Sequence, residues 1–273
     1  MARQGFVRQL VPDGRSGSTP GALTDSNLPL GARGARKVVH DVGRFVLRPS
    51  LPAAKIGPGR ACAFVFAILL TLDFTLAGGA IALETFATEA GYEPPAYVDS
   101  EWSLGWELAA LVLFAPLIEE AIFRGWLAGT RAWLRFGLHM AIVVVLLTLA
   151  AVSVDVLPGA ILAFITLFAL GLAIFAALRV RDRRHEEPQV PGWFRSNFRW
   201  FVWGSTLAFG AVHLSNFEGV SSPLDALLIL SQTAGALLLA YTRVHLGLRA
   251  AIAQHAVFNA VFAALSLAVD GSL

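Results

Sequence analysis

Three groups of polar residues interrupt the apolar segments of this 273-residue chain: Glu119 with Glu120, then His213, then His255 with Asn259. Ionisable groups are costly inside a membrane, so those that are present usually face the interior of a bundle and serve a function there. An acid, two imidazoles and a carboxamide are groups with which an amide hydrolase deprotonates water and stabilises a tetrahedral oxyanion. Two histidines and a carboxylate also match the ligand count of a catalytic zinc site. Glu119, Glu120, His213 and His255 could therefore also hold a divalent metal such as zinc.

Each group also has a simpler explanation when it is taken alone. Glu120 and Arg124 lie four residues apart, so we expect them to pair on one face of a helix. Glu119 lies about 100° around the same helix and is left for another partner, unless it is neutral and protonated. A single histidine on an apolar helix, such as His213, is more often a satisfied core residue than a ligand. An interhelical hydrogen bond would explain the third group almost as well.

The composition is that of a membrane protein with a basic N-terminal tail. Hydrophobic residues make up 56% of the chain and charged residues only 15%, whereas about a quarter of a soluble domain is charged. Residues 1–60 hold ten Lys and Arg against three Asp and Glu. Residues 1–57 lack the pattern of a cleavable signal peptide, and we expect a disordered, solvated cytoplasmic extension that binds no nucleic acid. Residues 58–270 then form the transmembrane domain.

The sequence predicts an all-α bundle of about seven transmembrane helices, because about 20 apolar residues cross the hydrocarbon core. Pro116 lies within the second segment and predicts a kink one turn before the glutamates. Lys and Arg gather at one end of the segments, which places the N-terminus in the cytoplasm and the protein in the plasma (inner) membrane. Asp73, in the first segment, would line the cavity or pair with a residue such as Gln232. The predicted segments are 61–86, 99–129, 136–156, 160–178, 200–215, 222–242 and 248–269.

The order and spacing of the motifs resemble a known family. Glu119-Glu120-x-x-x-Arg124, Phe209-x-x-x-His213 and His255-x-x-x-Asn259 are similar to the three-motif signature of the CPBP family. That family comprises the type II CAAX prenyl endopeptidases and related bacteriocin-processing and immunity proteins. The resemblance covers residues 104–268. The long interval between the first two motifs holds a hairpin, residues 136–180, which we interpret as an insertion of two spans that preserves the orientation of the motifs.

The resemblance implies a role for each motif residue. Glu119 would activate the attacking water, and His213 would help to hold that water or a metal. His255 and Asn259 would stabilise the oxyanion. Glu120, Arg124 and Phe209 would support the site. The family has been assigned both metal-dependent and metal-free mechanisms, and the sequence does not choose between them.

The favoured function is therefore an intramembrane endopeptidase that acts on a peptide or protein substrate near the cytoplasmic side of the bilayer. The motifs H-E-x-x-H and G-x-G-D of other intramembrane proteases do not occur in the chain, and G-x-S-G does not occur in any of its apolar segments. A non-catalytic immunity or scaffold protein of the same fold is the first alternative. A proton-coupled transporter is the second, because intramembrane Glu and His residues can relay protons.

Overall fold

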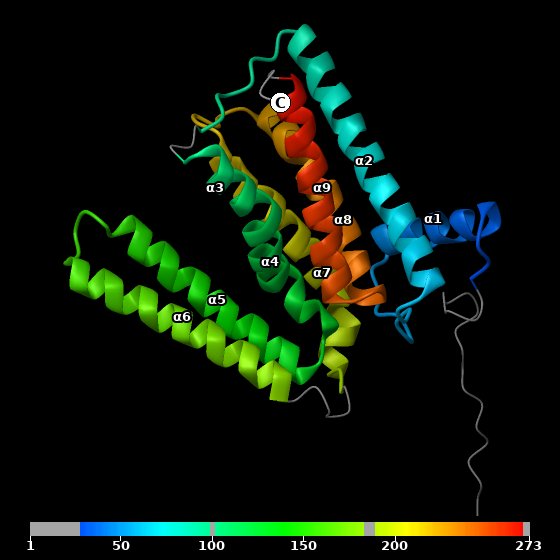
Figure 1. The fold of residues 1–273 in the computed structure, drawn as a ribbon, viewed down its shortest axis with the longest axis horizontal. Coiled ribbons are helices and arrows are strands. Elements are labelled where there is room, and N and C mark those ends of the chain that lie inside the picture. Colours follow the sequence, from blue (N-terminus) through cyan, green and yellow to red (C-terminus); the bar gives the residue numbers. More distant parts are fainter. Residues whose placement is uncertain (1–27, 99–101, 183–188, 270–273) are drawn as a thin grey trace, which may run out of the picture.

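The computed structural model describes residues 28–98, 102–182 and 189–269 and confirms the predicted all-α membrane bundle (Figure 1). Five helices in this part of the chain are long and apolar enough to cross a membrane. They are α2 (Arg60–Glu89), α5 (Arg131–Val152), α6 (Gly159–Asp182), Pro223–His245, which joins η6 (Pro223–Ile229) to α8 (Leu230–His245), and α9 (Leu248–Val269).

Two further predicted spans are less regular, so the number seven is not confirmed. The second span, which carries the glutamates, is divided into several short helices between Leu104 and Ala128. The fifth corresponds to α7 (Gly192–His213), which has Arg195, Asn197 and Arg199 in its first half. These two segments carry the first and second motifs, whereas the third motif lies in α9, which is one of the five apolar helices.

Helix α8 lies at the centre of the bundle. It packs against α2, α7 and α9, and every residue from Ala236 to His245 is buried. This half of the helix has no face toward lipid or water, and it buries the polar residues Thr242, Arg243 and His245 among apolar ones. It therefore connects the helices that carry the polar motifs.

A helix occupies part of the predicted disordered tail, and that expectation is wrong for residues 32–47. These residues form α1 (Ala32–Leu47), which crosses the end of the bundle near the start of α2 (Figure 1). Val38, Val42 and Phe45 are spaced by four and three residues, lie on one face, and are buried against the bundle. The many Arg and Gly residues of the tail obscured this amphipathic pattern. Residues 1–27 lie outside the described part of the chain.

Helices α5 and α6 form a hairpin that diverges from the bundle (Figure 1). They pack closely against each other, and α5 contacts the rest of the protein mainly through the segment 120–128. The hairpin has its own apolar core, separate from the core that α1, α2, α7 and α8 share. At its base the backbones approach closely, since a Cβ on Gly137 would lie 2.6 Å from Trp126 Cβ. The hairpin extends over residues 131–182, slightly beyond the predicted 136–180.

Candidate active site

The helix that carries the two glutamates is broken around Pro116. It consists of α3 (Leu104–Ala109), the π-helical η1 (Ala110–Phe114), α4 (Ala115–Glu119), the π-helical η2 (Glu120–Arg124) and the 3₁₀-helical η3 (Gly125–Ala128). Proline has no N–H and clashes with the preceding turn, so the regular hydrogen-bond ladder cannot pass through it. Short π-helical segments of this kind are frequent at functional sites. The kink predicted at Pro116 is thus a local change from α-helical to π-helical hydrogen bonding on either side of it.

Asn259 repairs the backbone that Pro116 disrupts. In η1 the Ala115 N–H donates to the Ala110 carbonyl, five residues back. In the same register the Leu111 carbonyl would need an N–H from Pro116, which has none. The Asn259 side chain supplies the missing donor, with Nδ2 2.9 Å from the Leu111 oxygen. One of the two amide protons of Asn259 is therefore used to hold α9 against the glutamate helix.

Glu120 and Arg124 form the ion pair that their spacing predicts. Arg124 Nη1 lies 2.8 Å from Glu120 Oε1, and both side chains are almost completely buried, at 1% and 0% exposed. The guanidinium also lies 3.9 Å from the ring centroid of Phe209, over its face. A buried charge needs a close partner of opposite sign. Phe209 and the ion pair together hold the acid of Glu120 in one position.

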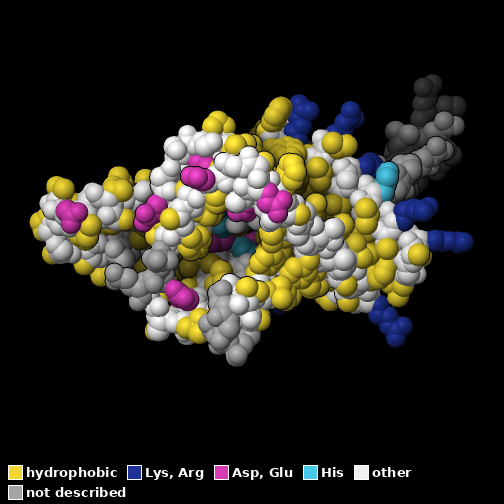
Figure 2. All heavy atoms as spheres, turned by 90° about the horizontal axis from the view of Figure 1, so that it is seen from above, with side chains coloured by type: hydrophobic (Ala, Val, Ile, Leu, Met, Phe, Trp, Pro, Cys, Tyr) yellow, Lys and Arg dark blue, Asp and Glu magenta, His cyan; other side chains and the backbone are white. Residues whose placement is uncertain are grey.

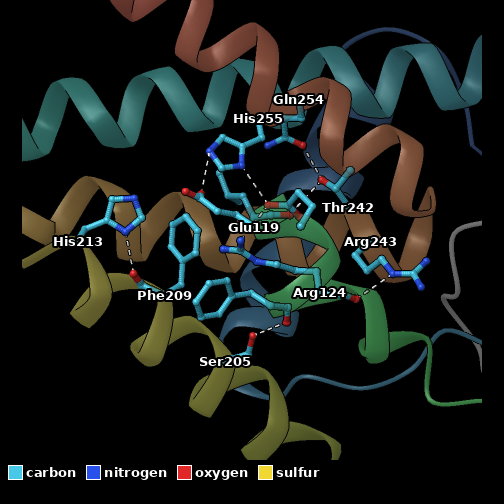
Figure 3. A network of polar contacts seen from close by, with 12 residues as sticks. Glu119, Arg124, Ser205, Phe209, His213, Thr242, Arg243, Gln254 and His255 are labelled. Carbon is cyan, nitrogen blue, oxygen red and sulfur yellow. Dashed lines mark hydrogen bonds and ion pairs between the residues drawn. The ribbon is translucent and has the colours of Figure 1, made fainter. Parts of the chain in front are cut away.

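His255 contacts both glutamates, and Figure 3 shows its ring beside Glu119. Its Nδ1 is 3.1 Å from Glu120 Oε1, and its Nε2 is 3.7 Å from Glu119 Oε2. A carboxylate that already accepts from Arg124 can only accept from His255, so Nδ1 carries the proton. The second ring nitrogen, Nε2, faces Glu119. Arg124, Glu120, His255 and Glu119 form one continuous chain of polar contacts.

His213 does not join this chain. It is the last residue of α7, and its Nδ1 lies 2.8 Å from the Phe209 carbonyl oxygen. The His213 ring lies 4.5 Å from the Phe209 ring, tilted by 47° to it, and the Phe209 ring lies 6.0 Å from the ring of His255. Among the described residues no acid lies within ion-pair distance of His213. The structure therefore brings Glu119, Glu120 and His255 together and keeps His213 at the edge of the site.

A buried network that the sequence did not predict holds α2, α8 and α9 together beside the site. Gln254 donates from Nε2 to Asp73 Oδ2 at 2.9 Å, and it accepts from Thr242 Oγ1 at 2.6 Å. The suggested partner of Asp73, Gln232, is wrong, since its side chain accepts from Ser231 instead. Gln254 directly precedes His255, so this network fixes the imidazole in α9. An amide within an apolar helix was a signal for such a network, but Gln232 and Gln254 share it, so it does not identify the member.

The basic end of the glutamate helix is capped by side chains from two other helices. Ser205 Oγ donates to the Phe123 carbonyl at 2.5 Å. Arg243 donates to the next two carbonyls, those of Arg124 at 2.9 Å and Gly125 at 2.6 Å. Helix ends leave carbonyls without partners, and burial makes each one costly. Arg243 is therefore a positioning residue. Its basic charge predicted only the orientation of the chain, but a charge inside the apolar run 236–245 was also a sign of a buried polar contact.

The acidic part of the site is accessible from one end of the bundle. Figure 2 views the molecule from the end at which α2 and α9 finish and shows a hollow with histidine and acidic side chains at its bottom. Glu119 lies fifteen residues after Leu104, at that end, and nine before Ala128, so roughly 22 Å and 14 Å separate it from the two ends. By this count the site lies nearer the basic end of the bundle, where Ala128 lies. The hollow seen in Figure 2 opens at the opposite, acidic end, where α2 and α9 finish.

Three buried polar atoms in the site have no hydrogen-bond partner within the described part of the chain. They are Glu119 Oε2, Glu120 Oε2 and Arg124 Nη2. Native proteins leave few buried polar atoms unpaired, and those that remain call for a bound molecule or a function. These atoms surround His255 and can bind water or a substrate.

The predicted metal ligands do not fit a metal site in this arrangement. Among the residues that the structure describes, no three His, Cys, Asp or Glu side chains come together closely enough to hold an ion. Glu120 is neutralised by Arg124, and His213 lies beyond Phe209.

Comparison with known proteins supports the family that the motifs resemble. Residues 101–185 match the family model described as type II CAAX prenyl endopeptidase Rce1-like. The matched segment contains Glu119, Glu120, Arg124 and the α5–α6 hairpin, whereas the motifs in α7 and α9 lie beyond it. No curated protein and no solved structure matches the chain.

Proposed function

We propose that the chain is an intramembrane endopeptidase in which Glu119 and His255 activate a water molecule. The observation that carries this proposal is the position of His255, whose Nδ1 contacts Glu120 and whose Nε2 faces the unpartnered oxygen of Glu119. If Nε2 of His255 carries no proton, it and Glu119 Oε2 are two acceptors 3.7 Å apart, and one water molecule between them can donate a hydrogen bond to each. The partial match to a CAAX-type protease family supports hydrolysis of a peptide bond.

The first chemical step is attack by this water. Its oxygen forms a bond to the carbonyl carbon of the substrate while Glu119 accepts one of its protons as general base. The π electrons of the carbonyl move onto its oxygen and give a tetrahedral oxyanion. The second amide proton of Asn259 is available as a donor to that oxyanion. Arg124 and Glu120 hold His255 in the tautomer that leaves Nε2 free for water.

The second step breaks the C–N bond. The oxyanion re-forms a carbonyl, and Glu119 returns its proton to the leaving nitrogen, so the products are a carboxylic acid and an amine. In this scheme His255 holds the water, a task that the family resemblance gave to His213. The geometry favours His255 because His213 contacts Phe209 and no acid in the described residues.

The test is cleavage of a membrane-anchored peptide library by the purified protein in proteoliposomes. We expect Glu119→Gln to lower the cleavage rate by about 10²- to 10⁴-fold, because it removes the general base while preserving shape. The thermal midpoint of unfolding should change little. Full activity of this variant would remove the proposed mechanism. Loss of stability together with an absence of cleavage by the unmodified protein would favour the non-catalytic scaffold.

A chelator arm of the same assay addresses the metal. In the scheme above, cleavage continues after treatment with a strong chelator. If chelation abolished cleavage and zinc restored it, a metal would have to bind in a rearranged site formed by Glu119, Glu120, His213 and His255.

We also propose that the N-terminus faces the cytoplasm and that the protein resides in the plasma (inner) membrane. Arg131, Arg195 and Arg243 lie at the same end of the bundle as α1, and basic residues remain on the cytoplasmic side during insertion. Protease accessibility of a tag at residue 1 in sealed inside-out vesicles tests this orientation. A tag that the protease cannot reach in these vesicles would show the opposite orientation.

A further inference from the structure

A second polar cavity lies at the basic end of the molecule, away from the hollow that leads to Glu119. It has a volume of about 820 Å³ and lies where the linker before α2, the start of α5, the end of α6, the start of α7 and the end of α8 meet. Among the residues that the structure describes, four cationic side chains line it, and no carboxylate does. They are Lys55, Arg131, Arg135 and Arg195.

These four cations lack protein counterions in the part of the chain that the structure describes. No Asp or Glu there lies within ion-pair distance of any of them. Lys55 is exposed at the rim of the cavity, but the surrounding protein desolvates its ammonium group in part; its pKa is lowered first by this desolvation and then by the charge of Arg243. Like charges around one volume repel each other, and an anion within it would relieve that repulsion. Arginine is well suited to such an anion because its planar fork binds phosphate through two parallel hydrogen bonds.

One wall of the cavity is rigid and aromatic. Trp133 lines it, and the guanidinium of Arg243 lies 4.6 Å from the Trp133 ring centroid. Arg243 is itself fixed by its hydrogen bonds to the Arg124 and Gly125 carbonyls. Trp133 is in the first turn of α5, a candidate membrane span, where tryptophan marks the level of the lipid headgroups. The cavity therefore lies at the depth at which lipid phosphates are found.

We propose that this cavity binds a phosphate-bearing anion, supplied by the headgroup of an anionic phospholipid. Basic pockets between transmembrane helices on the cytoplasmic side are suited to such headgroups. The inference does not depend on the proposed proteolysis, because none of the lining residues belongs to the Glu119 site.

The experiment counts lipids bound to the purified full chain by native mass spectrometry in a neutral detergent. Phosphatidylglycerol and phosphatidylcholine are compared at equal concentration. We expect one phosphatidylglycerol to bind at least about tenfold more tightly than phosphatidylcholine. The triple variant Arg131→Gln/Arg135→Gln/Arg195→Gln should abolish this preference, because each surface cation contributes roughly fivefold to the attraction.

The control is the triple variant Arg179→Gln/Arg181→Gln/Arg199→Gln. It removes the same charge from the same end of the molecule, but none of its residues lines the cavity. It should keep the preference for phosphatidylglycerol. An equal loss in both variants would mean diffuse attraction to the whole basic surface and would overturn the site. The single variants Arg135→Gln and Arg195→Gln, each expected to weaken binding several-fold, decide the question if the first triple variant fails to fold.

Glycerol 1-phosphate distinguishes the two sources of phosphate. If the lipid is the ligand, millimolar glycerol 1-phosphate leaves phosphatidylglycerol bound, because the acyl chains add binding energy that the soluble compound lacks. If it displaces the lipid at micromolar concentration, the lipid assignment is overturned in favour of a soluble phosphate.

Discussion

The polar bundle and the α5–α6 hairpin are both built from membrane helices, but different forces hold them together. In the bundle, side-chain hydrogen bonds join helices far apart in sequence, such as Gln254 to Asp73 and Arg243 to the Arg124 carbonyl. In the hairpin, the side-chain bonds formed by its described residues stay within one helix, as for His139 and Thr166. The contact between α5 and α6 is apolar.

The difference shows what each kind of packing can do. Between helices in lipid the hydrophobic effect gives little attraction, so close packing and hydrogen bonds must fix their positions. Apolar packing holds the hairpin together but places no polar group with directional accuracy. Hydrogen bonds from Asn259, Gln254 and Arg243 place the groups around Glu119 individually. We therefore expect matched substitutions to have different consequences in the two regions.

The largest difference should come from replacing a histidine in each region. His255→Gln removes the imidazole between the two glutamates and should lower the cleavage rate by about 10²- to 10⁴-fold. His139→Gln, in α5, should leave the rate within about twofold, because His139 bonds to the Arg135 carbonyl of its own helix, contacts Phe175 of α6 and takes no part in the glutamate site. Rates on the same membrane-anchored peptide measure both. Equal losses would show that the hairpin takes part in catalysis.

Removing an arginine should separate the two regions in stability. Arg124→Met leaves Glu120 buried without its cation and should lower the free energy of unfolding by about 3–5 kcal/mol. The double variant Glu120→Gln/Arg124→Met should recover most of that loss but not the cleavage activity. Arg179→Met, at the exposed end of the hairpin, is the control and should change stability by less than about 0.5 kcal/mol. Unfolding in mixed detergent micelles measures all three.

Glycine substitutions test where the hairpin is attached. Gly137→Ala places a methyl group against Trp126 and should destabilise the docked hairpin by about 1–3 kcal/mol. Gly171→Ala meets open space and should be neutral or slightly stabilising. Protease sensitivity of the hairpin and thermal unfolding report both effects. If Gly137→Ala had no effect, the close contact at the base would not hold the hairpin.

The smallest difference concerns a single hydroxyl. Thr242→Val removes one buried hydrogen bond to Gln254 and should cost about 0.6–2 kcal/mol. Thr166→Val in α6 removes a bond to its own helix and should cost less than about 0.5 kcal/mol. Their difference in unfolding free energy measures the contribution of the network beside His255. Equal values would mean that the network adds no stability to the bundle.

The sequence predicted those features that depend on local spacing. The Glu120–Arg124 pair follows from a separation of one helical turn, and the break at Pro116 follows from its missing N–H. The helical class and most of the apolar spans follow from hydropathy alone. The proximity of His255 to Glu119 was expected because the motif order resembles a known family.

Features that depend on the relative rotation of helices could not be predicted. Gln232 and Gln254 both carry a side-chain amide in an apolar helix. Asp73 pairs with Gln254 because of the direction in which each helix turns its glutamine. Phe209 precedes His213 by one turn, but the sequence does not show that the ring separates His213 from the acids. Helix α1 was missed because burial of Val38 and Phe45 depends on the tertiary surface beneath them.

The Glu120–Arg124 pair has a consequence for biosynthesis. The two charges are one turn apart in a single helix, so they can neutralise each other as soon as that helix forms. The segment can therefore enter the bilayer carrying its own counterion, before α7, α8 or α9 has been synthesised. Arg243, whose acceptors lie 118 and 119 residues earlier in the chain, can find them only after the glutamate helix is already in the membrane.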